Sequence, residues 1–191
     1  THMIASIPSI PSVITHCAEL DQFVERVQDA EWIAVDTEFM RDSTYYAKLC
    51  LVQIASADCS ACIDVLKLDD HSRLLELLQS PQQIKIFHSA RQDIEVLHSE
   101  YDLIPQPVFD SQIAASILGL DEQISYAELV SQILDVHLAK TESRTDWSRR
   151  PLTSAQINYA LDDVRHLGPL YLHLKKQLED NQRVHLSLIH I

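Results

Sequence analysis

The order of strand-like and helix-like segments constrains the fold of this chain of 191 residues more than any other feature. Runs rich in β-branched and aromatic residues predict strands at 32–39, 49–56 and 61–65, and no helix-like segment separates them. Strand-like runs at 84–87 and 108–110 are instead each followed by an amphipathic segment. Three strands in succession favour an antiparallel meander, whereas alternation of strand and helix favours parallel pairing. The sequence therefore predicts an α/β fold, with a mixed sheet of about five strands and helices on both faces.

Residues typical of helix starts and helix ends define the limits of the predicted helices. The spacing of apolar residues predicts a helix at about 15–30, with Thr15 as a plausible N-cap. A long final helix is expected from Thr153, and Gly168 and Pro169 should bend or interrupt it, because proline has no amide N–H. Further helices are predicted at 72–79, 90–101, 111–118 and 125–134, and an irregular stretch at about 140–151.

The amino-acid composition and net charge limit the size of the core, the role of the cysteines and the way in which nucleic acid could be bound. With 46% hydrophobic residues the chain can bury the core of one domain, and its four cysteines are expected to be free thiols. A net charge of −13 argues against tight, sequence-indifferent wrapping of nucleic acid, because that affinity comes mainly from Lys and Arg. Bound cations would offset part of this charge, so it does not exclude contact with nucleic acid. Weak and transient binding of nucleic acid is expected. No apolar stretch of membrane-spanning length and no secretory signal is found, which predicts a cytoplasmic location.

Four acidic residues stand where predicted elements begin or end. Asp36 and Glu38 are two apart at the end of the strand at 32–39, so their side chains face the same side. Asp93 falls in the first turn of a helix, and Tyr159 and Asp163 share one face of the last helix. Each motif alone has an ordinary structural explanation. Together they predict a metal-dependent nuclease, because converging carboxylates can hold two hard divalent cations that hydrolyse phosphodiesters.

The motifs around these acids resemble those of the ribonuclease D family. The resemblance rests on Val35 to Phe39, His88 to Asp93 and Tyr159 to Asp163, and extends over most of the chain from about Ile33 to Leu174. That family belongs to the DEDD 3′-to-5′ exonucleases, in the subgroup with a catalytic tyrosine. The resemblance implies a ribonuclease H-like α/β fold, with an exonuclease domain at 15–180. Residues 1–14 are interpreted as a tag remnant and N-terminal segment, and 181–191 as a C-terminal tail.

The resemblance also implies a role for each motif residue. Asp36, Glu38, Asp93, Tyr159 and Asp163 would be catalytic, with the four acids as ligands of two Mg²⁺ or Mn²⁺ ions. Asp36 is the candidate bridging ligand, because two cations about 4 Å apart need a shared carboxylate. Glu38 and Asp163 would complete one site, and Asp93 would serve the other directly or through water. The Tyr159 hydroxyl could orient the attacking water.

A histidine also lies close to one of the acids. In the sister subgroup a histidine precedes the last acid by five residues, and His88 has that spacing to Asp93. The residue five before Asp163 is Asn158, which favours the tyrosine assignment. We therefore interpret His88 as a strand-end residue near the cleft.

Three further acids have competing interpretations. Asp162 should point about 100° away from the acid that follows it, toward solvent or a cap. Asp110 could support the site or cap the helix that follows it. Asp146 and Arg144 could brace a loop over the site or form a structural ion pair.

Substrate contacts are expected from Thr37, Phe39, Tyr45, His88 and Arg144. Aromatic residues after the first motif, including Tyr46, could stack on terminal bases or belong to the core. The basic residues nearest the motifs could hold phosphates; they are Arg41, Lys48, Arg91, Lys140, Arg144, Arg149 and Arg150.

The expected function is a hydrolytic 3′-to-5′ exoribonuclease that releases 5′-mononucleotides. The resemblance implies RNA 3′ ends as the substrate, such as those of transfer RNA precursors, and we expect a monomer. Full ribonuclease D proteins carry additional helical nucleic-acid-binding domains, and the sequence is expected to lack them. Two alternatives stay open, a DNA-directed exonuclease of the same superfamily and a catalytically silent nucleic-acid-binding domain.

Overall fold

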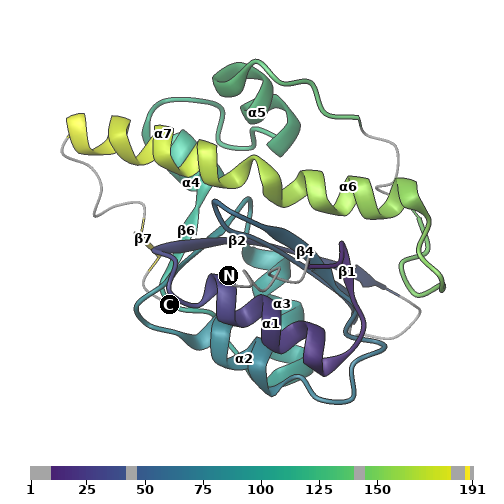
Figure 1. Cartoon of the computed structure of the whole chain (residues 1–191). Coiled ribbons are helices and arrows are strands. Elements are labelled where there is room, and N and C mark those ends of the chain that lie inside the picture. Colours follow the sequence, from purple (N-terminus) through teal and green to yellow (C-terminus); the bar gives the residue numbers. More distant parts are fainter. Residues whose placement is uncertain (1–9, 42–46, 140–144, 182–187, 190–191) are drawn as a thin grey trace, which may run out of the picture.

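A computed structural model of the chain describes residues 10–41, 47–139, 145–181 and 188–189. The structure is an α/β fold in which one mixed sheet is covered by helices on both faces (Figure 1). The strand order is β1-β4-β3-β2-β5-β6-β7. The strands are β1 (Val13–Ile14), β2 (Trp32–Met40), β3 (Lys48–Ala55), β4 (Ser60–Ile63), β5 (Ile84–Phe87), β6 (Val108–Asp110) and β7 (Leu188–Ile189).

The pairing of the five longer strands confirms the predicted topology. Strands β2, β3 and β4 form an antiparallel meander, and β5 and β6 are added in parallel next to β2. Two strands of two residues each extend the sheet beyond the five predicted ones. β1 pairs in parallel with β4, and β7 pairs antiparallel with β6.

Two groups of helices pack on opposite faces of the sheet. One group consists of α1 (Cys17–Val27), α2 (Ser72–Gln79) and α3 (Arg91–Tyr101). The other group consists of α4 (Ser111–Ile117), α5 (Tyr126–Leu134), α6 (Ser154–Arg165) and α7 (Leu167–Asp180). The first group buries the side chains of Ile33 and Val35, and the second buries Ala34 from the same strand. Alternate residues of β2 therefore face different layers of helices.

The first helix begins later than predicted. Thr15 is not the N-cap, because α1 begins at Cys17 after His16. The Glu19 side chain accepts hydrogen bonds from the backbone N–H groups of Thr15 (2.9 Å) and His16 (3.2 Å). The sequence predicted a threonine hydroxyl as the cap, but an acidic side chain inside the first turn accepts the hydrogen bonds of these backbone amides instead.

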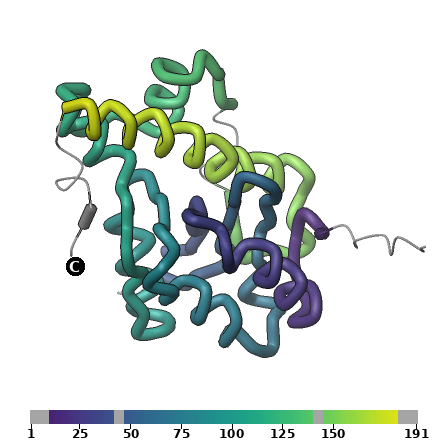
Figure 2. Tube along the Cα trace, turned by 60° about the vertical axis from the view of Figure 1, so that its left-hand side comes forward, coloured from purple at the N-terminus to yellow at the C-terminus, as the bar shows by residue number. Residues whose placement is uncertain are grey.

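The long final helix is interrupted, as predicted, between α6 and α7. The break lies at His166, whose backbone angles are φ −97° and ψ −9°. Pro169 explains its position, because proline cannot donate to the carbonyl of Arg165 and its ring clashes with that carbonyl. Gly168 next to it lies against an aromatic ring, since an added Cβ would be 2.1 Å from Cη2 of Trp32. Figure 2 shows α6 and α7 following one another across the same side of the molecule.

Two further features bear on the class of protein. None of the helices in the described part of the chain has the length and apolar surface that crossing a bilayer requires. All four cysteines are free, with Cys50 and Cys62 buried. The predicted positions Tyr45, Tyr46 and Arg144, together with Lys140, lie outside the described residues.

Candidate metal centre

The site forms where β2 extends beyond the end of β5. β5 pairs with β2 from Trp32 to Ala34, and the chain then leaves the sheet and enters α3. The following residues of β2 keep β3 as a neighbour on one side only. Ligands of open α/β sheets bind at such carboxyl ends of parallel strands, next to a change in strand order.

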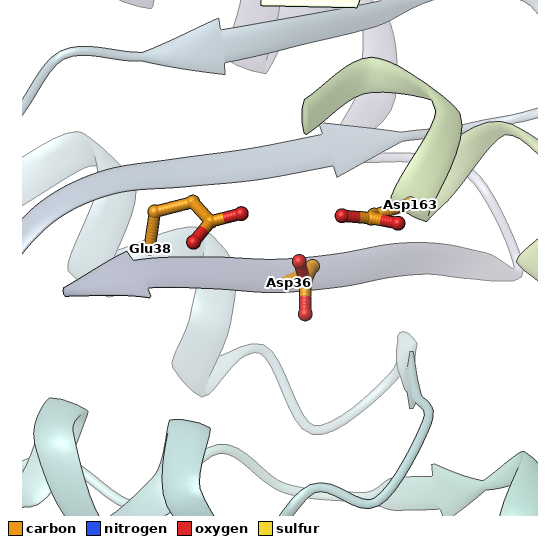
Figure 3. A group of neighbouring side chains, drawn as sticks. All are labelled: Asp36, Glu38 and Asp163. Atoms are coloured by element: carbon orange, nitrogen blue, oxygen red, sulfur yellow. The ribbon is translucent and has the colours of Figure 1, made fainter. Parts of the chain in front are cut away.

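Three acids meet at this end of the sheet. Asp36 and Glu38 project from β2 toward α6, and Asp163 projects from α6 toward them (Figure 3). One carboxylate oxygen from each can be chosen so that all three lie within 4.8 Å of one another. This arrangement brings together three of the four predicted ligands, from a strand and a helix far apart in sequence.

Asp93 reaches the same pocket from the other face of the sheet. Its Oδ1 accepts hydrogen bonds from the backbone N–H (3.1 Å) and the hydroxyl (2.6 Å) of Thr37. The backbone N–H is on the edge of β2 that β5 leaves unpaired. Asp93 is therefore held beside the group of three acids without being a member of it.

Burial raises the pKa of every acid in the pocket. The pKa of Asp36 lies well above its ordinary range because of burial and the negative charges of Asp93, Asp163 and Glu38. Burial, with the charge of Asp163, raises the pKa of Glu38 to about 9. Burial raises the pKa of Asp163 to about 7, with a smaller contribution from Asp162, and that of Asp93 to about 6. Such carboxylates are ready to exchange protons for a cation, because a nearby positive charge favours their ionised form.

Tyr159 lies one turn before Asp163 on α6. Burial and the nearby acids raise its pKa, so its hydroxyl stays protonated at neutral pH. A hydrogen bond with this hydroxyl lowers the pKa of Asp163. The ring of Trp147 packs against Tyr159, with the ring centroids 6.2 Å apart and the planes inclined by 37°. The hydroxyl group is thus a fixed donor at the edge of the acid cluster.

The acids line a pocket of about 400 Å³. His88 and Phe39 also line it, as expected for residues near a cleft. The imidazole of His88 bonds Ser111 Oγ (2.9 Å) and the carbonyl of Ile124 (2.9 Å), and burial lowers its pKa. The remaining lining residues are Thr37, Ser89, Gln92, Tyr126 and Leu167.

Sequence reasoning missed Tyr126 as a residue of this pocket. Its hydroxyl donates to the backbone carbonyl of Asp162 (2.8 Å), and its ring packs against His88 at a centroid distance of 5.7 Å. The only local signal was the Ser125 cap that starts α5. The contact with α6 depends on tertiary packing, which residue spacing does not encode.

Two of the acids with competing interpretations have structural roles. Asp110 caps α4 by accepting from the N–H groups of Gln112 (2.8 Å) and Ile113 (3.4 Å). It also accepts from the N–H groups of Ser89 (3.0 Å) and Ala90 (2.8 Å), so it fixes the turn that leads into α3. Asp162 points away from the cluster and pairs with Arg165 at the surface.

Arg150 was predicted as a possible phosphate contact, and this prediction is wrong. Its guanidinium forms a two-pronged ion pair with Asp64, whose side chain is 2% exposed (Nε–Oδ2 2.6 Å, Nη2–Oδ1 2.8 Å). Further N–H groups donate to the carbonyls of Trp147 and Cys50. A guanidinium used in this way is not available to a phosphate.

Comparison with known proteins gives consistent results. A sequence model of a family described as 3′-5′ exonuclease matches residues 11–179. Ribonuclease D of Granulibacter bethesdensis is 43% identical over 175 residues, which cover 91% of this chain and 44% of that protein. Ribonuclease D of Bartonella henselae is 41% identical over 174 residues, covering 91% and 43%. The chain therefore spans less than half the length of these curated relatives.

Solved structures show the same similarity. The structure of Escherichia coli RNase D matches with a TM-score of 0.86 at 38% identity, covering 89% of this chain and 45% of that chain. Brucella melitensis NrnC bound to pGG matches with a TM-score of 0.74 at 31% identity, covering 84% and 79%. NrnC has also been solved with bound Mg²⁺.

Proposed function

The chain belongs to the 3′-5′ exonuclease family, and from this premise we propose that it is a metal-dependent exoribonuclease that shortens RNA from its 3′ end to 5′-mononucleotides. The resemblance to ribonuclease D is confirmed by similarity over 91% of the chain. One observation carries the proposal. Asp36, Glu38 and Asp163 meet in a pocket that Asp93 and Tyr159 also line.

The donor set fits two divalent cations, Mg²⁺ or Mn²⁺. Hard cations prefer carboxylate oxygens, and three such oxygens can lie within 4.8 Å of one another here. Asp36, Glu38 and Asp163 would hold the cations, with Asp93 as a further ligand. When bound, such cations activate water and neutralise the charge that develops on a phosphate. The presence of Mg²⁺ in NrnC supports this assignment.

The protein's own groups would position the reactants. Tyr159 keeps its proton and can hold the attacking water by a hydrogen bond beside Asp163. Thr37 uses its N–H and hydroxyl to hold Asp93, so we assign it a positioning role more than a substrate contact. Phe39 and His88 line the pocket wall and would contact the terminal nucleotide.

The substrate, assembly and location remain part of the proposal. Relatives named ribonuclease D support RNA as the substrate class. Within that class we propose structured RNA 3′ ends, such as those of transfer RNA precursors. We further propose that the protein acts as a monomer in the cytoplasm.

Digestion of 5′-labelled single-stranded RNA with Mg²⁺ or Mn²⁺ tests the proposal. We expect stepwise shortening from the 3′ end, and a loss of at least about 100-fold in rate for Asp163→Asn. Asp162→Asn is the matched control, because it removes a neighbouring exposed carboxylate outside the cluster, and its rate should stay within about threefold of wild type.

Three results would contradict the proposal. Equal rates for Asp163→Asn and wild type would remove the acid cluster from the chemistry. Equal digestion of RNA with a free and a blocked 3′ end would exclude exonuclease action. Faster digestion of matched DNA than of RNA would favour the DNA-directed alternative.

A further inference from the structure

Gln53 is a buried amide in the middle of β3, beside the acid cluster. Its side chain is 0% exposed, and neither Oε1 nor Nε2 has a hydrogen-bond partner among the residues that the structure describes. Leaving such a buried group unsatisfied costs about 1–3 kcal/mol. An apolar residue would avoid that cost, so a partner that forms in the working state of the protein would explain the amide.

The register of the sheet places Gln53 directly across from Asp36. The antiparallel pairing of β2 with β3 sets these two residues opposite each other, and pairing of β3 with β4 sets Cys62 on the other side of Gln53. Paired residues point to the same face and have Cβ atoms about 4.5–5.5 Å apart. A glutamine side chain can span that distance to reach the carboxylate of Asp36.

Two of the other acids already have a side-chain hydroxyl partner. Asp93 is held by Thr37, and Asp163 interacts with Tyr159. For Asp36, no side-chain hydrogen bond is found among the described residues, because the N–H and the hydroxyl of the adjacent Thr37 both donate to Asp93. Carboxylates that bind metals are usually fixed by a second shell of donors, which orients them toward the cation.

We propose that Gln53 is the positioning residue for Asp36, and that its amide Nε2–H donates to the Asp36 carboxylate when this carboxylate binds a divalent cation. An amide suits this role because it donates a hydrogen bond without adding charge. A lysine at this position would repel the cation, and an acid would add to the negative charge of the cluster. The inference rests on the proposed metal centre and adds a residue that does not line the pocket.

Replacing Gln53 with methionine tests the inference, because methionine keeps the length and approximate volume while removing both polar atoms. The measurements are Mn²⁺ affinity by calorimetry and the melting temperature of the metal-free protein. For Gln53→Met we expect about tenfold weaker Mn²⁺ binding. The metal-free melting temperature should be unchanged or higher, because an unsatisfied amide is removed.

Cys62→Val is the matched control. It changes a buried side chain in the same row of the sheet, one strand farther from Asp36. We expect Mn²⁺ affinity within about twofold of wild type for this variant, because a thiol is only a weak donor.

The outcomes separate this inference from the proposed function. If wild type binds Mn²⁺ and Gln53→Met binds it equally well, the role of Gln53 is refuted while the metal centre stands. If Cys62→Val weakens binding as much as Gln53→Met, the effect comes from packing and the role is again refuted. If wild type itself does not bind Mn²⁺, both the metal centre and the inference fail.

Discussion

Each carboxylate in the pocket has opposite effects on cation binding and on the stability of the metal-free protein. Glu38, Asp163 and Asp93 have pKa values of about 9, 7 and 6, all above those of exposed carboxylates. The folded state therefore binds more protons than the unfolded state between about pH 4 and pH 9. The stabilising contribution of these groups is complete below about pH 4 and is lost as pH rises through these pKa values.

We accordingly expect the metal-free protein to become less stable from about pH 6.5 to pH 8, by roughly 2–3 kcal/mol. The range starts at about pH 6.5 because burial lowers the pKa of His88, and its deprotonation favours folding as pH rises to that value. Urea denaturation at several pH values measures this. The range stops at pH 8 because burial lowers the pKa of Lys85 to about 8, and its loss of charge favours folding at higher pH. In the Asp36→Asn variant, the free energy of unfolding should depend less steeply on pH. Stability that rises with pH over this range would contradict the raised pKa values.

Replacing Tyr159 with phenylalanine should separate chemistry from cation binding. The change removes only a hydroxyl, so Mn²⁺ affinity should stay within about threefold of wild type, while turnover falls about 100-fold. Calorimetry and single-turnover RNA digestion measure the two quantities. Equal losses in both would mean that the hydroxyl acts by organising the acids and not by holding the attacking water.

The spacing of residues along the sequence was enough to predict the acids. The residues that it missed depend on strand register and on tertiary packing. Strand parity put Asp36 and Glu38 on one side, and helical spacing related Tyr159 to Asp163. Gln53 was missed because its relation to Asp36 depends on which residues of β2 and β3 pair. Tyr126 was missed in the same way, since its contact with α6 joins elements whose packing is not a local property.

At the scale of elements, a buried ion pair holds the segment before α6. Arg150 pairs with Asp64 at the end of β4 and donates to the carbonyl of Trp147, whose ring packs on Tyr159. Removing one partner of a buried pair leaves an uncompensated charge. The pair therefore connects the sheet to the residues that surround Tyr159.

Arg150→Met should lower the free energy of unfolding by about 3–5 kcal/mol. Arg165→Met is the matched control, because Arg165 and Asp162 form a pair whose side chains are 44% and 43% exposed. Its effect should stay within about 0.5 kcal/mol. Similar losses in the two variants, measured by urea denaturation, would show that burial of the Asp64 pair does not matter.

Close contact between α7 and β2 gives a second prediction at this scale. A Cβ on Gly168 would lie 2.1 Å from the Trp32 ring, so either the helix or the strand must move. We expect Gly168→Ala to destabilise the fold by about 3 kcal/mol, measured by denaturation. Combining it with Trp32→Leu, which removes the far edge of the ring, should recover part of the loss. A neutral single variant would contradict the packing described.

The predicted elements largely agree with the structure, and the differences have physical causes. The five longer strands were predicted because each is long enough for a strand-like composition to be recognised in the sequence. β1 and β7 have two residues each, which is too short for any periodicity. The helix break was expected from Gly168 and Pro169, although its position at His166 follows from the carbonyl that Pro169 displaces. The start of α1 was misplaced because Glu19 replaces a hydroxyl cap.

At the scale of the whole molecule, charge limits how the chain could hold the RNA substrate proposed for it. The sequence has 28 acidic residues and 15 basic ones. Of the basic residues near the motifs, Arg150 is engaged by Asp64, and Arg91 pairs with Glu95. Two of the seven basic residues near the motifs are thus paired with acids, and cations held by the acid cluster would add to the attraction for phosphates.

This balance predicts a shallow dependence of RNA binding on salt. If about three phosphates are neutralised by side chains, the logarithm of the binding constant should fall with the logarithm of salt concentration with a slope of about −2. Binding of a single-stranded RNA to Asp163→Asn between 50 and 200 mM KCl, at fixed excess Mg²⁺, measures the slope without digestion. A slope steeper than about −5 would require a basic surface that the net charge of −13 argues against.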